Sequence, residues 1–180
     1  MQIPNLNNLG ENTSLRLAYP VTEDSVNAII QLIRDSRNNT RVRQTVENIL
    51  ETEVAEKKWV EEIRAVYNFV KRKMHYMRDP DGYEYIKTPD KMIREIQQKG
   101  VTSGDCDDHT TLLGSLLINA GYAIRIVIIV SKYNPSNNYN HIYLYANKPF
   151  TDEWLSLDAT AKDQNFGYEA EYRLIKVYDV

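Results

Sequence analysis

The order of the hydrophobic patterns along the chain constrains its fold more than any other feature. Apolar residues recur at the three- and four-residue spacing of amphipathic helices as far as Gly121, and segments rich in β-branched and aromatic residues follow. Helices that precede strands in this way are typical of an α+β fold. We therefore expect N-terminal helices followed by an antiparallel sheet that packs on the last of those helices.

Five segments have the spacing of amphipathic helices. The first three have apolar stripes at Val26, Ile29, Ile30 and Ile33, then Val42, Val46, Ile49 and Leu50, then Trp59, Ile63, Val66, Tyr67, Val70 and Met74. Because no breaker separates the second from the third, these two could form one continuous helix. The fourth has Thr88 as its cap and Pro89 at its first helical position, and it ends at Gly100. The fifth ends at Gly121, and its apolar positions are Leu112, Leu113, Leu116 and Leu117.

The strand-like segments all follow the fifth helix, and they are Ala123–Val130, Tyr139–Ala146, Glu153–Thr160 and Tyr172–Tyr178. Met77–Lys87 is predicted to be a loop, because Pro80 and Gly82 punctuate it. Residues 1–20 are rich in Asn, contain two prolines and show no periodicity, so we expect an extended or loosely docked arm. No internal repeat or low-complexity tract divides the 180 residues, which favours one continuous domain.

Charge and composition exclude several classes of function. The formal net charge is −3, and no Lys/Arg run stands out, so we expect no nucleic-acid partner. No apolar run reaches the length of a membrane span, and residues 1–8 lack the basic flank and apolar stretch of a signal peptide. We therefore expect a cytoplasmic protein without membrane contact.

Cys106 is the only cysteine, and it lies at the first turn of the fifth predicted helix. A lone cysteine is by default a small buried hydrophobe. A helix N-terminus, however, stabilises a thiolate, and its N–H groups can receive the oxyanion that forms when a thiolate attacks a carbonyl. Asp105, Asp107 and Asp108 disfavour the thiolate by their charge, so a cationic partner is required. The histidines that could serve are His75, His109 and His141.

A hairpin register brings one of these histidines next to a carboxylate. If Asn147 pairs with Asp152, opposed residues of the two strands sum to 299, and His141 lies opposite Asp158. The same face then holds aromatic residues that could line a cleft, namely Tyr143, Tyr145 and Trp154. Because the Cβ atoms of opposed residues lie about 4.5–5.5 Å apart, Asp158 can hold the ring of His141 in one tautomer.

The other histidines and the aspartates have less specific interpretations. His109 shares a helical face with Cys106, but an imidazolium is disfavoured near a helix N-terminus, so we expect a neutral ring packed or hydrogen-bonded beside the site. His75 ends a basic helix and is expected on a solvated face. A divalent metal is disfavoured, because consecutive helical residues point in different directions. The residues considered for it are Asp105, Asp107, Asp108 and His109, of which Asp108 could instead support the site by a contact. We expect no metal and no cofactor.

Several motifs resemble those of the transglutaminase-like superfamily. Gly104–Thr110, with the sequence Gly-Asp-Cys-Asp-Asp-His-Thr, resembles the start of the nucleophile helix, and Gly121–Val127 resembles the first core strand. His141 in a strand and Trp154–Thr160 resemble the histidine strand and the Trp-x-x-x-Asp element of that family. The resemblance spans roughly residues 60 to 160.

The resemblance implies a papain-like cysteine enzyme. The arm (1–20) and a helical extension (21–56) fall outside the resemblance, and together with a core (57–180) they make up the single expected domain. In the family, a cysteine attacks a carboxamide or peptide carbonyl and forms a thioester, which water or an amine resolves. The matching residues are Cys106 as nucleophile, His141 as base and Asp158 as the group that orients the base. A second oxyanion donor in many relatives is an upstream aromatic side chain, for which the candidates are Tyr83 and Tyr85.

Compact proteins with this pattern are frequent in phage and prophage genomes. The resemblance therefore implies a protein of the host cytoplasm or the virion, with phage structural proteins as further partners. The expected function is cleavage of amide or peptide bonds in a protein or peptide substrate, because water needs no dedicated acceptor site. The alternatives are transfer to a lysine amine by a transglutaminase, a catalytically inactive assembly or binding module and, more distantly, removal of glycans from asparagine.

Overall fold

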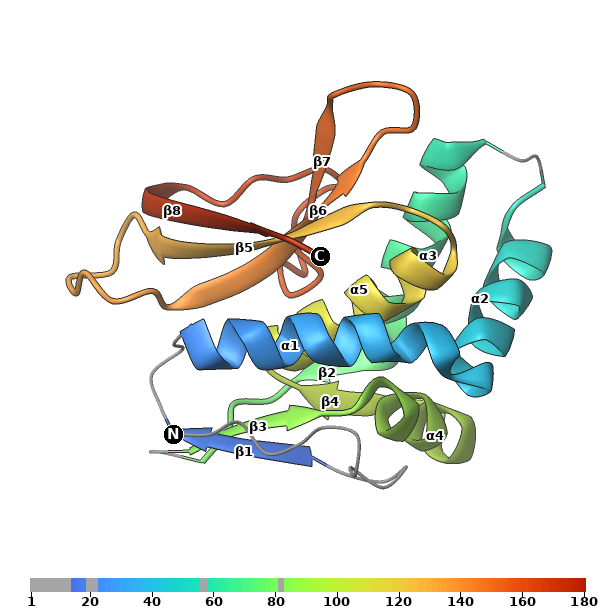
Figure 1. Ribbon diagram of the computed structural model, residues 1–180, viewed down its shortest axis with the longest axis horizontal. Helices are drawn as coiled ribbons and strands as arrows, with labels where there is room; N and C mark the ends of the chain where they lie inside the picture. Colours follow the sequence, from blue (N-terminus) through green and yellow to red (C-terminus); the bar gives the residue numbers. More distant parts are fainter. Residues whose placement is uncertain (1–13, 19–22, 56–57, 81–82) are drawn as a thin grey trace.

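The computed structural model describes residues 14–18, 23–55, 58–80 and 83–180, and a single helix lies at its centre. This helix, α5 (Cys106–Asn119), is buried from Cys106 to Ile118. Figure 1 shows a four-stranded sheet on one side of α5, and α4 with two small sheets on the other. The nucleophile candidate therefore begins the element around which the rest of the chain packs.

The other helices lie where their apolar spacing predicts them. They are α1 (Glu23–Asp35), α2 (Thr40–Glu53), α3 (Trp59–Lys73) and α4 (Pro89–Lys99), and a short 3-10 turn, η2 (Ser36–Asn38), joins the first two. The possibility that the second and third form one helix is wrong, because Val54 and Lys58 have extended backbone and turn the chain. This turn allows both helices to contact α5. Among the described residues, no helix has the length and apolarity needed to cross a membrane.

The main sheet is antiparallel, with the order β7-β6-β5-β8, and it confirms the α+β prediction. Its strands are β5 (Ile124–Ser131), β6 (His141–Asn147), β7 (Trp154–Leu157) and β8 (Tyr172–Asp179). One face packs against α5 and buries alternate residues such as Ile126, Ile128, Ile142 and Leu144. The strand β7 ends three residues before the predicted Thr160, so Asp158 lies outside the sheet.

Two small sheets were not expected from the sequence. Strand β1 (Ser14–Ala18) pairs antiparallel with β3 (Tyr83–Lys87), and β2 (Met74–Tyr76) pairs parallel with β4 (Thr102–Gly104). The loop prediction for Met77–Lys87 is therefore wrong in its last five residues, and residues 14–18 of the predicted extended arm form a strand of the first of these sheets. Residues 1–13 and 19–20 of the arm lie outside the described residues. Each short strand has a distant partner, which local periodicity does not reveal.

A close helix crossing sets the position of α5. A Cβ atom added at Gly114 would lie 2.6 Å from Cδ1 of Ile33 on α1, so a larger residue there would force the buried Ile33 side chain or the helix to shift. Ile33 and the leucines of α5 are fully buried. The crossing anchors the middle of α5 and leaves its first turn at the junction of β3, β4 and β6.

Candidate active site

Cys106 is the first residue of α5, as the sequence predicts. Asp105 is the N-cap, and its Oδ1 accepts a hydrogen bond from the backbone N–H of Asp107 at 3.1 Å. The thiol is 9% exposed, and it lies 3.6 Å from Oδ1 of Asp107, to which it donates. The side chain is therefore nearly enclosed, at the end of the helix where backbone N–H groups favour negative charge.

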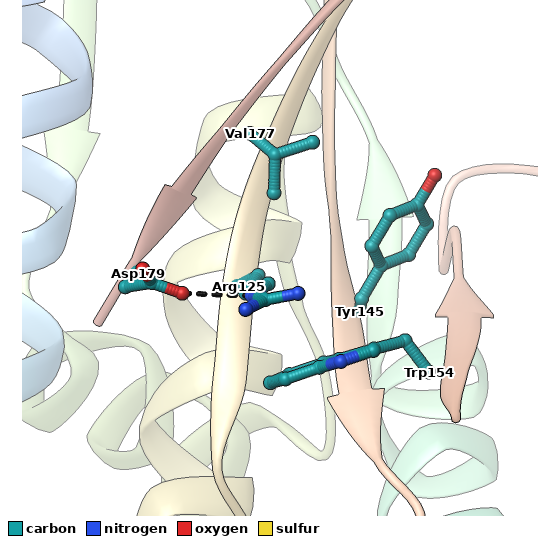
Figure 2. Close-up of a pocket in the computed structure, with 5 residues that line it drawn as sticks. All are labelled: Arg125, Tyr145, Trp154, Val177 and Asp179. Carbon is teal, nitrogen blue, oxygen red and sulfur yellow. Dashed lines mark hydrogen bonds and ion pairs between the residues drawn. The ribbon is translucent and has the colours of Figure 1, made fainter. Parts of the chain in front are cut away.

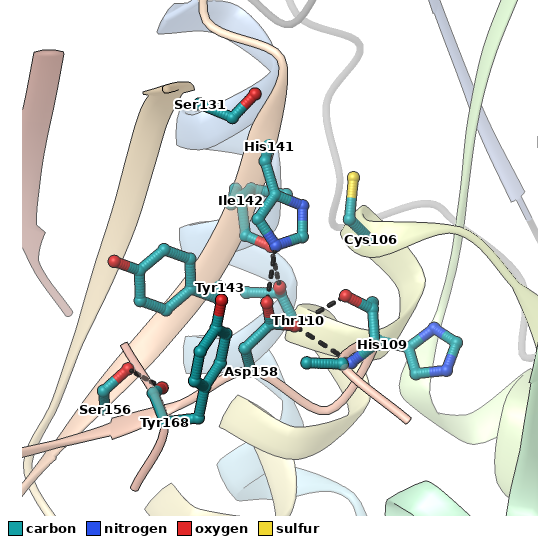
Figure 3. A network of polar contacts seen from close by, with 12 residues as sticks. Cys106, His109, Thr110, Ser131, His141, Ile142, Tyr143, Ser156, Asp158 and Tyr168 are labelled. Atoms are coloured by element: carbon teal, nitrogen blue, oxygen red, sulfur yellow. Dashed lines mark hydrogen bonds and ion pairs between the residues drawn. The ribbon is translucent and has the colours of Figure 1, made fainter. Parts of the chain in front are cut away.

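A buried hydrogen bond joins the first turn of α5 to the start of β6. Thr110 lies one helical turn after Cys106, on the same face, and its hydroxyl donates to the carbonyl of Ile142 at 3.2 Å. Ile142 directly follows His141. Figure 3 shows the side chain of Cys106 and the carboxylate of Asp158 on two sides of the His141 ring. The structure thus brings these three predicted residues into one site.

His141 and Asp158 form a direct pair. Nε2 of His141 lies 2.7 Å from Oδ2 of Asp158, and the two side chains are 21% and 5% exposed. The pairing arises without the predicted register, which is wrong by two residues. Tyr145 pairs with Ser156 and Asn147 with Trp154, so opposed residues sum to 301. A two-residue shift keeps every side chain on its face, and it leaves Asp158 just beyond β7, still within reach of His141.

Local polar contacts explain the wider hairpin. The backbone N–H of Lys148 donates to the carbonyl of Glu153, and the N–H of Thr151 donates back to the carbonyl of Lys148. The carboxamide of Asn147 also donates to the carbonyls of Thr151 and Glu153. These bonds close a six-residue loop in place of the predicted shorter one.

The carboxylate of Asp158 has a second set of donors. The backbone N–H and the hydroxyl of Thr160 donate to its Oδ1 at 3.0 and 2.6 Å. Burial raises the pKa of Asp158, but the hydrogen bonds from His141 and Thr160 outweigh burial, so that this pKa lies below its usual value. Asp158 is therefore ionised at neutral pH. Thr160 was missed from the sequence, although a threonine two residues after an aspartate is a common turn pattern.

His109 is a buried neighbour of the site. Its side chain is 3% exposed, and Nδ1 lies 2.7 Å from the backbone carbonyl of Asp105. Because a carbonyl only accepts, Nδ1 carries the hydrogen. Burial lowers the pKa of His109 below its usual value, which favours the neutral ring. This placement agrees with a packed, hydrogen-bonded histidine beside the site.

Asp108 faces away from the thiol and joins α5 to β3. Its Oδ1 accepts a hydrogen bond from the backbone N–H of Lys87 at 2.7 Å, and burial raises the pKa of Asp108 to about 8. A Cβ atom at Gly104 would lie 2.1 Å from Oδ2 of Asp108, so this position of the carboxyl requires a glycine at residue 104.

Three residues at the start of α5 offer possible metal ligands whose atoms lie within 4.8 Å of one another, namely Asp105, Cys106 and Asp107. Asp108 and His109 have the other partners just described, so the four residues considered for a metal do not converge.

One aromatic residue beside the nucleophile is Tyr76, which was not among the predicted oxyanion donors. It ends β2 opposite Gly104, and its ring lies 6.2 Å from that of His109. Burial raises the pKa of Tyr76, and the neighbouring Cys106 and Asp105 raise it further. The predicted candidates, Tyr83 and Tyr85, lie on β3 with their rings 6.1 Å apart. Only the parallel pairing of β2 with β4 identifies Tyr76, and that pairing is not a local signal.

Tyr143 supports His141 and does not line a cleft, which corrects the prediction. It is 1% exposed, and its ring is stacked 5.8 Å from that of His141. Its hydroxyl donates to Oε1 of Glu169 at 2.5 Å, and Tyr145 donates to the same oxygen at 2.7 Å. The segment that carries Glu169 therefore covers this part of the sheet.

Trp154 and Tyr145 do line a pocket (Figure 2). It lies on the sheet face that carries His141, at the end of the strands away from His141. Its volume is about 320 Å³, and its other walls are Arg125, Val177 and Asp179. The guanidinium of Arg125 lies 4.0 Å above the ring of Trp154, and its Nε is 2.7 Å from Asp179. Arg125 pairs with Tyr145 in the sheet, whereas His141 pairs with Ile129 four residues further along β5. The pocket is thus separate from the Cys106 site.

Comparisons with known proteins bear on this arrangement. A family model described as the transglutaminase-like superfamily matches residues 43–159, a range that begins inside α2, earlier than the motifs alone indicated. No curated protein matches the chain. A crystal structure of a candidate cysteine protease from Cytophaga hutchinsonii is 12% identical, with a TM-score of 0.48, over 85% of this chain and 55% of that one. The chain therefore spans about half the length of that protein.

Proposed function

The chain belongs to the transglutaminase-like superfamily, and from that premise we propose that it is a thiol-dependent acyl enzyme that acts on amide or peptide bonds of a protein or peptide. In this proposal Cys106 is the nucleophile, His141 is the base and Asp158 holds the base. The observation that carries the proposal is the 2.7 Å contact between His141 and Asp158, at the strand start that Thr110 ties to the nucleophile helix.

The tautomer of His141 follows from this contact. Since Asp158 is ionised, it accepts a hydrogen bond from Nε2, and Nδ1 is left to exchange a proton with the thiol of Cys106. The resulting imidazolium is stabilised by the carboxylate, and the thiolate by the N-terminus of α5. The imidazolium that Asp158 stabilises thus compensates for the acidic residues that surround Cys106.

The reaction then has two stages. The thiolate attacks the carbonyl carbon, an Sγ–C bond forms, and the backbone N–H groups at the start of α5 receive the oxyanion. His141 gives its proton to the leaving nitrogen as the C–N bond breaks, which leaves a thioester on Cys106. Water, deprotonated by His141, then attacks the thioester and releases the acid and the thiol. The hydroxyl of Tyr76 is proposed as the second donor to the oxyanion, in place of Tyr83 or Tyr85.

An alkylation experiment separates this proposal from an inactive assembly module. Iodoacetamide should label Cys106 rapidly at about pH 6 in the wild type and slowly in His141→Ala, because only the thiolate reacts. His75→Ala is the matched control, since His75 is exposed on β2, and it should label like the wild type. Slow labelling that neither substitution changes would refute the proposed role of His141.

A second step distinguishes hydrolysis from transfer. The wild-type protein and Cys106→Ala are incubated with a glutamine-containing peptide and a labelled primary amine. Hydrolysis is expected, because water needs no acceptor site, and it converts the carboxamide or peptide bond to an acid without incorporating the amine. Incorporation that depends on Cys106 would instead identify a transglutaminase.

A further inference from the structure

Asp158 occupies an unusual place for a residue that must be held accurately. The strand β7 ends at Leu157, and no helix or strand occurs between residues 158 and 171. A residue at the start of a long turn segment has no ladder of backbone hydrogen bonds to fix it. Local bonds, from Thr160 to the carboxylate and from the N–H of Ala161 to the carbonyl of Asp158, fix only the first turn of this segment. Side chains from elsewhere hold it against the rest of the molecule.

One face of α3 supplies those side chains. The hydroxyl of Tyr67 donates to the backbone carbonyl of Asp158 at 3.1 Å. One helical turn later, Nζ of Lys71 lies 3.0, 3.0 and 3.2 Å from the carbonyls of Ala161, Lys162 and Gln164. An ammonium group has three hydrogens to donate, and three carbonyl acceptors surround this one.

A third contact extends the same stripe of α3. The ring of Phe166 packs edge-on against Tyr67, with centroids 5.5 Å apart, and the guanidinium of Arg64 lies 4.3 Å above the ring of Phe166. Arg64, Tyr67 and Lys71 are spaced by three and four residues, so they lie on one helical face. That face holds the chain from Asp158 to Phe166.

We propose that Lys71 is a positioning residue that keeps Asp158 in register with His141 by closing the turn at residues 161–164. This inference rests on the proposed function. Without the ammonium group, three carbonyls lose their shared donor, and the turn that begins at Asp158 can move. A substitution far from the reacting atoms that misplaces a catalytic group by about 1 Å can lower the rate about a hundredfold.

The test compares Lys71→Met, which keeps the length of the side chain and removes its donors, with Lys73→Met on the same helix. At about pH 6, iodoacetamide labelling of Cys106 should fall about 10- to 100-fold in Lys71→Met and stay at the wild-type rate in Lys73→Met. At about pH 9, where the thiolate forms without help, all three proteins should label alike. An unfolded protein would show the same dependence on pH, because a free cysteine has a pKa of about 8.5. The comparison therefore uses Lys71→Met protein whose urea-unfolding transition shows that it is folded under the labelling conditions.

The hydrogen on Nε2 of His141 gives an independent readout. In wild-type protein it should give a distinct low-field NMR signal because Asp158 binds it, and in Lys71→Met that signal should broaden or vanish. If Lys71→Met does not fold, Tyr67→Phe, which removes only the bond to the carbonyl of Asp158, should show the same effects at smaller size.

The outcomes separate the two proposals. If wild-type Cys106 is not activated at about pH 6, the proposed function fails. If wild-type Cys106 is activated and Lys71→Met matches Lys73→Met in both labelling and NMR signal, the role of Lys71 is refuted and the proposed function stands. If Lys71→Met does not fold, the same conclusion follows from a Tyr67→Phe protein that matches the wild type in both the labelling rate and the NMR signal.

Discussion

The two ends of the candidate site are built in different ways. Cys106 is held by its own helix, with its cap at the preceding residue and the close crossing at Gly114 further along. Asp158 lies outside the sheet and is held by Tyr67, which is 91 residues away in the sequence, and by the turn that Lys71 closes. Cys106 is thus capped by its immediate neighbour on a buried helix, whereas Asp158 combines the local bonds from Thr160 with contacts from the distant helix α3.

A helix start positions a thiol with little help from the rest of the chain, whereas a carboxylate on a turn segment transmits any distant disturbance to the imidazole that it holds. Substitutions around Asp158 should therefore change the reactivity of Cys106 as well as stability, whereas those that support the start of α5 should act mainly on stability.

The largest effect is expected at the carboxylate itself. Asp158→Asn should lower the rate of peptide turnover by about 10³- to 10⁴-fold, because a carboxamide no longer stabilises the imidazolium or its productive tautomer. Asp90→Asn is the matched control, since Asp90 is also buried but is paired with Arg41 and Arg94 on another part of the chain. Equal rates in the two variants would contradict the role given to Asp158.

A smaller effect is expected at the donor that supports Asp158. Thr160→Val should cost about 1.5–3 kcal/mol in urea unfolding at neutral pH, because the ionised carboxylate loses a hydroxyl donor. The folded pKa of Asp158 is lowered, so its contribution is present above the unfolded pKa and is lost as the pH falls through the folded value. The difference from wild type should therefore shrink in acid. Thr52→Val, at an exposed threonine of α2, should cost less than about 0.5 kcal/mol.

At the nucleophile end, Gly104→Ala should destabilise the fold by about 1–3 kcal/mol, because the new methyl group collides with the carboxyl of Asp108. Urea unfolding measures the change. In an Asp108→Ala background the same substitution should cost clearly less, since the colliding atoms are gone. An unchanged cost in that background would show that the strain has another source.

A pH titration separates the two buried carboxylates, Asp158 and Asp108, by the sign of their contribution to stability. The folded pKa of Asp108 is raised to about 8, so the folded state binds a proton that the unfolded state has lost, and this contribution to stability declines as the pH rises towards that value. Asp108→Asn, which keeps an acceptor for Lys87, should flatten the fall of Tm between about pH 5 and pH 8. A variant with the wild-type slope would contradict the raised pKa.

The same contrast explains which features could be predicted from the sequence. The position of Cys106 follows from local signals, because the capping aspartate and the leucines of α5 are its near neighbours. The sequence predicts that His141 pairs with Asp158, but it does so through a hairpin register that is wrong by two residues. Strand alternation fixes the face of a residue but not its exact partner. The correct register depends on the side chain of Asn147 in the hairpin loop.

Other features have no local signal. Lys71 looks like part of a solvated basic stretch until the carbonyls of residues 161–164 are placed above it. Tyr76 becomes a neighbour of Cys106 only when β2 pairs with β4, and the pairing of β1 with β3 joins segments that are far apart in the chain. Each of these depends on a contact between distant parts of the chain.

The central claim is that His141, held by Asp158, converts Cys106 to a thiolate. The most direct test is the ultraviolet absorbance of the thiolate against pH, with the absorbance of Cys106→Ser subtracted. Wild-type protein should show the thiolate at about pH 6, and His141→Ala should show it only near the ordinary range at about pH 8.5. Two superimposed curves in the ordinary range would contradict the claim.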